Sequence, residues 1–350
     1  MTSVLSLLNY FKSTIKGTSN INVKRCTLSN NIFTCDGNTT TIEKNTWYQS
    51  SSNQINISYT TTGKAKVTAR TVDKSNNYNE STKDFTINKY TITFNKGIAD
   101  KIGGEVSNIS KSCYAISGQS CSITSPDIEK KGYTIIGWNT NKNATTSIWN
   151  INTSKSISSS ATYYPILKAN IYTITLNNQG ATSSGTKKVY YQYNTTKTIN
   201  GTTCYYYTNS SLTTCLSGGY NINKPSKTGY SFKGYYTSTN GSGTNYVNSS
   251  GTFINNAYKT IGDKTLYANW QANTYTITYN ANGGSGAPSS QSYTYDPNND
   301  TVFYLSSTTP SRSGYTFLGW SLSSTATSAS YSAGQRWGTH NANNYTLYAV

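Results

Sequence analysis

The chain has 350 residues, of which 34% are hydrophobic, and it carries 29 Lys and Arg against 12 Asp and Glu, a formal net charge of +17. With a single histidine and few carboxylates, it offers little for general acid–base chemistry, so we expect neither an enzyme nor a cofactor. The low hydrophobic content limits each domain to a modest core, which the 32 tyrosines enlarge because each brings a large apolar ring.

Residues 1–17 place apolar side chains at helical spacing and predict a short amphipathic helix or the boundary of a fragment. These side chains are Val4, Leu5, Leu7, Leu8, Phe11 and Ile15. The segment lacks the basic start, long apolar core and small-residue cleavage site of a secretory signal. No apolar run in the chain approaches the roughly twenty residues that a transmembrane helix needs, so none is expected in this fragment.

Residues 18–89 contain short alternating runs of polar and apolar residues separated by Asn and Ser turns, which is typical of a small β-domain. The stretch 71–78, followed by Phe85, resembles the last hairpin of a bacterial immunoglobulin-like domain. We therefore expect a small immunoglobulin-like β-sandwich at this position.

Three phrases repeat in fixed order through the rest of the chain. The opening phrase, close to Tyr-Thr-Ile-Thr-x-Asn, occupies 90–95, 172–177 and 275–280. The second, close to Gly-Tyr-Thr-Phe-x-Gly-Trp, occupies 132–138, 229–235 and 314–320. The closing phrase, rich in Thr, Leu and Tyr, occupies 162–165, 265–270 and 346–350. Their spacing is too long for a solenoid and predicts three small tandem domains, here named repeat 1 (90–170), repeat 2 (171–273) and repeat 3 (274–350).

Each opening phrase alternates with a period of two. Tyr90, Ile92 and Phe94 share one face, and Thr91 and Thr93 share the other, which predicts a strand with one buried face. The Asn and Gly residues that follow each opener predict tight turns. Helix signals are weak throughout. We therefore expect a mainly β protein with minor α structure, in which each repeat is a small mixed sheet with one short helix.

The six cysteines form three close pairs, Cys26 with Cys35, Cys113 with Cys121, and Cys204 with Cys215. Zinc sites favour closely spaced ligand clusters, and the one histidine, His340, lies far from every pair in the sequence, so we expect disulfides and no metal site. Disulfides indicate an oxidising compartment, which predicts a protein outside the cell.

The positive charge is concentrated between Glu129 and Asp263, where the chain has lysines but no acidic residue. Such an excess attracts anionic polymers. The candidate contacts in repeat 2 are Lys187, Lys188, Lys197, Lys224, Lys227 and Lys233. Because the lysines are spread out and not packed in runs, we expect no nucleic-acid partner. The alternative is that the lysines only keep the surface soluble.

Aromatic side chains offer a second set of candidates. The tryptophans of the strand phrases, for which core packing is favoured over ligand stacking, are Trp138, Trp270 and Trp320. Tyr205, Tyr206 and Tyr207 lie between the third pair of cysteines, and we expect this loop to expose at least one ring as a contact surface. The alternative is that all three are ordinary edge-strand tyrosines.

The three phrases in this order resemble the Listeria–Bacteroides repeat, the B-repeat type first named in internalin B. The resemblance covers about residues 90–350 and implies compact ubiquitin-like, β-grasp domains that stand in tandem within extracellular surface proteins of bacteria. It also implies a role in adhesion or host interaction. Repeat 1 departs from the pattern at 164–167, where Ala-x-Trp is absent, and repeat 2 carries Tyr235 where Trp is usual.

We therefore expect the non-catalytic repeat region of a longer bacterial surface protein, extracellular or secreted. Short linkers at 168–170 and 271–274 favour a semi-rigid stalk that carries the other domains of the same protein. Adhesion through lysine-rich faces to anionic glycans or cell-wall polymer is expected in addition. The alternatives are a structural spacer with no ligand of its own and a module that binds a host surface protein.

Overall fold

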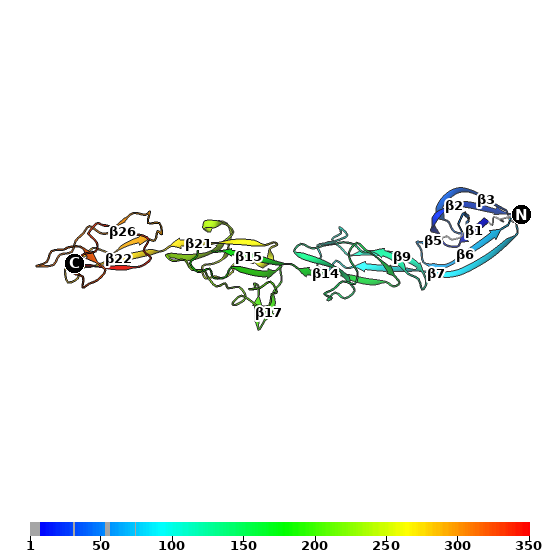
Figure 1. The fold of residues 1–350 in the computed structure, drawn as a ribbon. Helices are drawn as coiled ribbons and strands as arrows, with labels where there is room; N and C mark the ends of the chain where they lie inside the picture. Colours follow the sequence, from blue (N-terminus) through cyan, green and yellow to red (C-terminus); the bar gives the residue numbers. More distant parts are fainter. Residues whose placement is uncertain (1–7, 31, 53–56, 74) are drawn as a thin grey trace, which may run out of the picture. The chain divides into compact units, whose positions relative to one another are not determined.

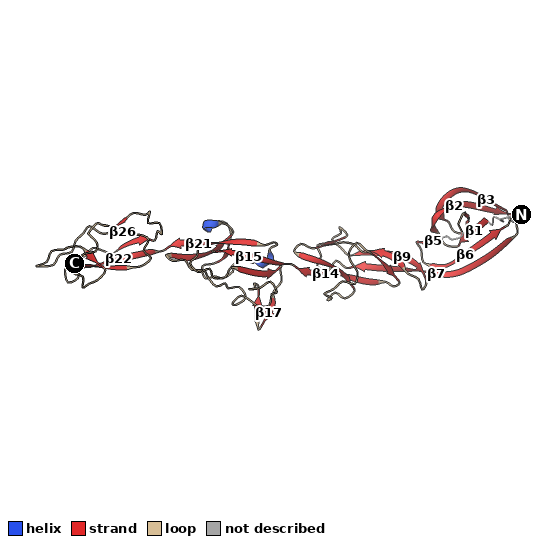
Figure 2. Ribbon diagram, viewed as in Figure 1, coloured by secondary structure: helices blue, strands red, loops and turns tan. Residues whose placement is uncertain are grey.

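A computed structural model describes residues 8–30, 32–52, 57–73 and 75–350 and is mainly β (Figures 1 and 2). Its described residues include two short 3-10 turns, η1 (Thr239–Gly241) and η2 (Ala257–Lys259), and no helix long and apolar enough to cross a membrane. The chain divides into two compact units, Met1–Lys168 and Ala169–Val350, and each is described by itself.

The first unit begins with an N-terminal domain of seven strands. They are β1 (Leu8–Ser13), β2 (Gly17–Ser29), β3 (Ile32–Ile42), β4 (Trp47–Ser50), β5 (Ile57–Tyr59), β6 (Gly63–Val72) and β7 (Tyr78–Phe94). Their order in the sheet is β7-β6-β1-β4-β2-β3, and β5 pairs with β2. The disulfide between Cys26 and Cys35 joins β2 to β3 across the hairpin, as the spacing predicts.

The prediction of a helix at 1–17 is wrong for the described part of this segment, because Leu8–Ser13 is a strand. Residues 1–7 lie outside the described residues. β1 lies between β4 and β6 and is therefore paired on both edges. Tyr10 and Phe11 are consecutive residues of β1, so their side chains point to opposite faces of the sheet, and both are buried. A strand buried on both faces loses the two-residue alternation that would distinguish it from a helix in sequence.

Repeat 1 shares its first strand with the N-terminal domain, because β7 runs without a break from Tyr78 to Phe94. Ile87 packs in the core between the two domains, whereas Ile92 and Phe94 lie in the core of repeat 1. The further strands are β8 (Lys101–Ile102), β9 (Ile109–Ile116), β10 (Cys121–Thr124), β11 (Ile128–Glu129), β12 (Tyr133–Asn139), β13 (Ser154–Ile157) and β14 (Ala161–Ala169). The four main strands are ordered β9-β7-β14-β12, with β7 and β14 parallel.

The second unit contains repeats 2 and 3. The strands of repeat 2 are β15 (Ile171–Asn177), β16 (Lys188–Gln192), β17 (Lys197–Ile199), β18 (Thr202–Cys204), β19 (Tyr230–Tyr236), β20 (Asn245–Val247) and β21 (Lys264–Ala272). Those of repeat 3 are β22 (Thr274–Asn280), β23 (Gln291–Thr294), β24 (Phe303–Tyr304), β25 (Trp320–Ser321), β26 (Arg336–Trp337) and β27 (Tyr345–Ala349). Their sheet orders, β16-β15-β21-β19-β20 and β23-β22-β27-β25, again place the first and last strands side by side and parallel.

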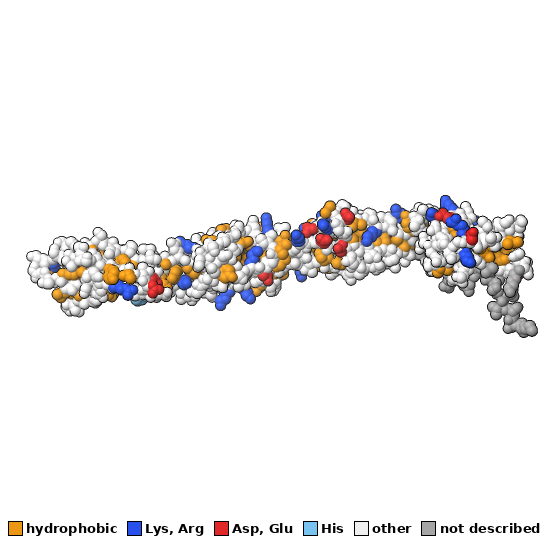
Figure 3. Space-filling model, turned by 90° about the horizontal axis from the view of Figure 1, so that it is seen from above, with side chains coloured by type: hydrophobic (Ala, Val, Ile, Leu, Met, Phe, Trp, Pro, Cys, Tyr) orange, Lys and Arg blue, Asp and Glu red, His pale blue; other side chains and the backbone are white. Residues whose placement is uncertain are grey.

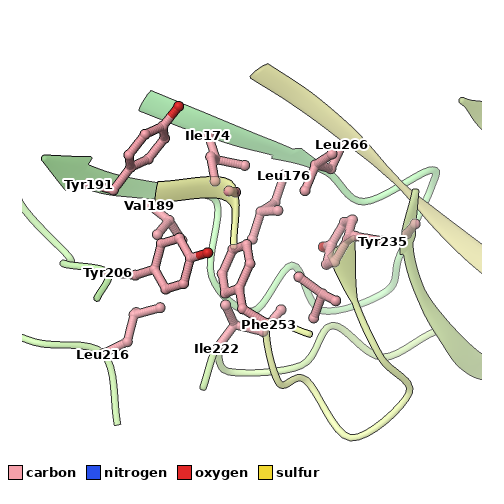
Figure 4. Packing of buried hydrophobic residues seen from close by; sticks show 13 residues of the cluster. Ile174, Leu176, Val189, Tyr191, Tyr206, Leu216, Ile222, Tyr235, Phe253 and Leu266 are labelled. Carbon is pink, nitrogen blue, oxygen red and sulfur yellow. The ribbon is translucent and has the colours of Figure 1, made fainter. Parts of the chain in front are cut away.

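Each repeat buries the aromatic residue that ends its second phrase. Trp138, Tyr235 and Trp320 are each 0% exposed and belong to the three separate cores. Figure 4 shows the core of repeat 2, where Tyr235 lies beside Leu266 and Leu176. The core role expected of the two tryptophans is confirmed. Trp270 is half-buried and packs on Phe232, with 5.5 Å between ring centroids.

The remaining cysteines are also paired. Cys113 on β9 is bonded to Cys121 on β10, and Cys204 at the end of β18 is bonded to Cys215. Both disulfides close short loops beside a repeat core, and repeat 3 has the same main sheet order without one. The disulfide is therefore an addition to the fold and not a condition for it.

The core of repeat 1 can be tested at Phe94, which is fully buried and contacts Trp138, Trp149 and Tyr163. We expect Phe94→Ala to lower the free energy of unfolding of this repeat by about 3–5 kcal/mol, because it removes a ring from a closed core. Ile98→Ala is the control, since Ile98 is 61% exposed; its effect should stay within about 0.5 kcal/mol. Hydrogen exchange of peptides from β12 and β14 measures both, and equal effects would contradict this account of the core.

Candidate interaction surfaces

The six candidate lysines of repeat 2 do not form one surface. Five are exposed, whereas Lys227 is half-buried. Its Nζ donates to the carbonyl oxygen of Gln179 at 3.2 Å and lies 4.6 Å from the centroid of the Tyr230 ring. Lys227 therefore stabilises the fold locally and is not free to bind a polymer in this arrangement.

Lys187 and Lys188 are consecutive in the chain, and the backbone that carries Lys224 lies beside the backbone that precedes them. The backbone N–H of Thr186 donates to the carbonyl of Asn223 at 2.9 Å, so the lysines that follow these two residues are neighbours. The remaining two lie elsewhere: Lys197 begins β17, and Lys233 is on β19, which the sheet order separates from β16. On the face in Figure 3, Lys and Arg side chains are likewise scattered and form no single patch.

The tyrosine loop is not the exposed contact surface that we expect from the sequence. Tyr206 is 2% exposed and Tyr207 is 1% exposed, and Tyr205 is half-buried. The Tyr206 ring stacks on Phe253 with a centroid separation of 4.0 Å, and its hydroxyl donates to the carbonyl of Asn255. Tyr205 and Tyr206 pack with the repeat core, and Tyr207 packs with Cys204 and Leu212 in a small cluster of its own. The prediction of an exposed contact surface is therefore wrong, because the rings of Tyr206 and Tyr207 are buried.

A basic residue two positions before the Gly-Tyr pair is a feature that our sequence reasoning missed. It lies over the tyrosine ring in all three repeats. The distances to the ring centroid are 5.9 Å for Lys130 over Tyr133, 4.6 Å for Lys227 over Tyr230 and 4.3 Å for Arg312 over Tyr315. Such cation–π contacts contribute roughly 0.5–1 kcal/mol at exposed sites. The signal was present in the sequence as a basic residue at the same place in each copy.

The cations also tie the Gly-Tyr turn to the segment after the opening strand. Lys227 donates to the Gln179 carbonyl, and Arg312 Nη1 donates to the Asn282 carbonyl at 3.3 Å. In repeat 1, Lys130 instead forms a 2.8 Å ion pair with Asp100. The Lys130 hydrogen bond, with the backbone N–H of Lys131, lowers the pKa of Asp100 below its usual range.

Asp296 is held in a similar way. The backbone N–H groups of Thr301 and Asn298 donate to its carboxylate and lower its pKa. A carboxylate stabilised in its charged form caps a turn. Its lowered pKa is the opposite of the raised pKa that a general acid needs at neutral pH.

Among the residues that the structure describes, no group of three or more His, Cys, Asp or Glu is placed to hold a metal ion.

The junction between repeats 2 and 3 is a third candidate, and it consists of a single residue between two strands. β21 ends at Ala272 and β22 begins at Thr274. Asn273 lies between them and bonds to both sides: its N–H donates to the Gly229 carbonyl at 2.9 Å, its carbonyl accepts from the Tyr295 N–H at 2.8 Å, and its Oδ1 accepts from the Ser231 hydroxyl at 2.6 Å. The linker residue is therefore bonded to repeat 2 and repeat 3 at once.

Tyr295 of repeat 3 packs directly on the Gly-Tyr turn of repeat 2. Its ring meets that of Tyr230 edge to face, with centroids 5.5 Å apart and an angle of 89°. A Cβ atom added at Gly229 would fall within contact of the Tyr295 ring. Gly229 also has φ +76°, a conformation that favours glycine. Glycine is thus needed at this position both for the turn and for the approach of the next repeat.

These features define a class of protein: a tandem array of small β-domains whose first and last strands are parallel neighbours. Residues 90–165 and 275–350 match the family model of the Listeria-Bacteroides repeat domain. A stretch of 132 residues is also 34% identical to a protein of Evansella cellulosilytica named "Putative Gly-rich membrane protein". That similarity covers 35% of this chain and 14% of the relative, so it spans a small part of the relative's length.

The burial of Tyr206 predicts a late alkaline titration. Burial raises the pKa of its hydroxyl well above the ordinary value, because the ionised form would lose its hydration. Below about pH 10 the Tyr206 hydroxyl is neutral in both the folded and the unfolded chain, and its contribution to the free energy of unfolding is fully present. Above that pH the unfolded chain releases the hydroxyl proton while the folded chain keeps it, so the stability of the folded chain falls as pH rises. Tyr206→Phe should remove phenolate absorbance from the late, unfolding-linked part of the titration. If the variant instead lost phenolate absorbance in the early part of the titration, before unfolding, the burial of Tyr206 would be contradicted.

The junction predicts different effects for alanine at two equivalent glycines. Gly229 and Gly314 have φ +76° and +78°, so either substitution strains the backbone, by about 1–3 kcal/mol. Only at Gly229 does a side chain of another repeat occupy the space that the methyl group needs; nothing lies within 4 Å at Gly314. We expect Gly229→Ala to accelerate amide exchange at Asn273 and Tyr295, and Gly314→Ala to leave both amides unchanged. Equal exchange in the two variants would contradict the packing of Tyr295 on Gly229.

Proposed function

We propose that this chain is a spacer within a bacterial surface protein, a semi-rigid series of domains that carries other domains of the same protein. The observation that supports the proposal most directly is the single-residue junction at Asn273, bonded on both sides and covered by Tyr295. Three disulfides favour an oxidising environment. The family of residues 90–165 and 275–350 and the relative named as a membrane protein agree with a place at the cell surface.

We propose further that residues 171–273 are a third copy of the same repeat. Its sheet order and its parallel first and last strands match those of repeat 3. The Tyr191 hydroxyl lies within hydrogen-bond distance of the carbonyls of Thr260 and Gly262, as the Tyr293 hydroxyl does of those of Asn341 and Asn343. This shared bonding supports common ancestry of the two domains.

We also propose a β-grasp fold for the repeats and an immunoglobulin-like fold for the N-terminal domain. A β-grasp arrangement is supported by the parallel central pair, with strands and turns in place of an α-helix in the described crossing segments. An immunoglobulin-like sandwich in the N-terminal domain is supported by β2, whose first part pairs with β5 and whose second part pairs with β4. One strand therefore changes partners along its length, as a strand shared by the two layers of a sandwich would.

Adhesion to an anionic glycan or wall polymer is the second candidate. Lys187, Lys188 and Lys224 support it, because they are exposed and lie on adjacent backbone segments, and charges near one another increase the local potential. The spacer remains the better supported function, because the other three candidate lysines are separated from this group or engaged within the fold.

Retention on an immobilised sulfated glycan and on wall polymer tests the two functions. We expect the triple variant K187Q/K188Q/K224Q and the charge-matched control K64Q/K83Q/K89Q to be released at the same, low salt concentration, because dispersed charges are screened alike. The control lysines are exposed and lie in the N-terminal domain and its shared strand. Saturable retention near physiological salt that only the first variant loses would overturn the spacer-only function and establish adhesion.

A further inference from the structure

The first and last strands of a repeat are the strands through which tension along the chain enters and leaves it. In repeat 2 the chain enters at the start of β15 and leaves at the end of β21, and these two strands are parallel neighbours (Figure 1). A pull on the two ends of the repeat therefore acts on the two strands in opposite directions along their common axis. Because the hydrogen bonds of a parallel pair are evenly spaced along the strands, such a pull loads all of them together.

The same pairing is present in all three repeats. The paired segments are 92–94 with 161–163, 174–177 with 264–267, and 277–280 with 345–348. In repeat 1 the backbone N–H of Asn95 extends the ladder by donating to the Tyr163 carbonyl at 2.8 Å. Each repeat thus places a parallel ladder of hydrogen bonds between the strand where the chain enters and the strand where it leaves.

A side chain adds one further bond to this ladder at the same place in each repeat. The backbone N–H of the first threonine in the opening phrase donates to the residue that directly precedes the closing strand. The bonds join Thr91 to Ser160 Oγ at 2.9 Å, Thr173 to Asp263 Oδ1 at 2.8 Å, and Thr276 to Asn344 Oδ1 at 2.8 Å. The three acceptors differ in residue type, yet each holds the opening strand to the start of the closing strand.

In repeats 2 and 3 a tyrosine hydroxyl also holds the residue just before that acceptor. The Tyr191 hydroxyl lies 2.9 Å from the carbonyl oxygen of Gly262, and the Tyr293 hydroxyl lies 2.8 Å from that of Asn343. Both tyrosines are buried in the cores of their repeats. The start of the closing strand is therefore held by the core as well as by the ladder.

We propose that each repeat is a load-bearing clamp, which keeps the chain folded when it is pulled from its two ends. Forced unfolding is governed by the unfolding rate, and that rate is set by bonds that must break before the strands can slide. The parallel ladder supplies these bonds, and Asp263 and its counterparts extend it at the end where the load enters. The use of such a clamp rests on the proposed spacer function, because a spacer transmits any pull on the domains that it carries.

Single-molecule pulling on the full chain at constant force tests the direction of this resistance. Handles on cysteines introduced as Ile171→Cys and Gln271→Cys load β15 and β21 in shear, because these positions lie at opposite ends of the pair. Handles at Ile171→Cys and Thr265→Cys load the same two strands from one end, so that their bonds break one after another. All three positions are exposed, and the native cysteines are all in disulfides. We expect repeat 2 to unfold about tenfold or more slowly in the shear arrangement at the same force, because several hydrogen bonds must break together.

Variants of Asp263 test the bond that extends the ladder. Asp263→Ala removes the acceptor of the Thr173 N–H and should raise the unfolding rate of repeat 2 in the shear arrangement about tenfold. Asp263→Asn keeps an oxygen at this position, as Asn344 does in repeat 3, and should leave the rate near its natural value.

Asn248→Ala is the control for the loss of a hydrogen-bonded side chain outside the ladder. The Oδ1 atom of Asn248 accepts the backbone N–H groups of Ser250 and Thr252 in a turn of the same repeat. Because this turn is not part of the pair that carries the load, the unfolding rate under shear should stay unchanged in this variant.

Equal unfolding rates in the two pulling arrangements would overturn the proposal, and so would equal effects of Asp263→Ala and Asn248→Ala under shear. Either result leaves the spacer function standing, since that function depends on the junction at Asn273 and not on the strength of a single repeat. If repeat 2 resists shear as expected but the junction lets repeats 2 and 3 move independently, the spacer function fails and the clamp remains.

Discussion

Parallel pairing of the first and last strands is the constraint on which each repeat depends. β15 pairs with β21 from Ile174 to Asn177, and β22 pairs with β27 from Ile277 to Asn280. Two parallel neighbours begin at the same end of a sheet, so the chain that starts a repeat at one end must leave it at the other. Everything between them must cross back over the sheet, because a parallel connection requires a long crossover. In the repeats this crossover supplies the second phrase and the buried aromatic residue.

The pairing also explains why the linkers are so short. A seven-residue strand spans about 23 Å. The last strand of a repeat therefore ends, in an extended conformation, at the end of the sheet opposite to the one where the repeat began. One residue then suffices to begin the next strand: Asn170 stands between Ala169 and Ile171, as Asn273 stands between Ala272 and Thr274. Within the second unit, both asparagine carbonyls accept a backbone hydrogen bond, from Tyr193 and from Tyr295. At Asn273, which is bonded to the repeats on both sides, the asparagine thus takes the place of a flexible linker.

The sequence predicted the parts of this architecture that alternate or repeat. The alternation in 90–95 was sufficient to assign the buried face of the opening strand, and the short spacing of the cysteines was sufficient to pair them, as the three disulfides confirm. It failed at β1, where both faces are buried and no alternation remains, and at Tyr206, whose burial depends on contact with Phe253 far along the chain. The junction could not be predicted for the same reason, since Tyr295 meets Gly229 only after both repeats have folded.

The central claim, that the Asn273 junction fixes repeats 2 and 3 relative to each other, is tested most directly by distances between spin labels. All six cysteines are paired, so introduced cysteines can be labelled specifically. A pair at Lys233→Cys and Val302→Cys reports across the junction, and a pair at Lys188→Cys and Lys233→Cys reports within repeat 2. The account predicts one distance distribution across the junction as narrow as that within the repeat. A distribution several times broader would contradict it and leave the repeats as independently moving domains on a short tether.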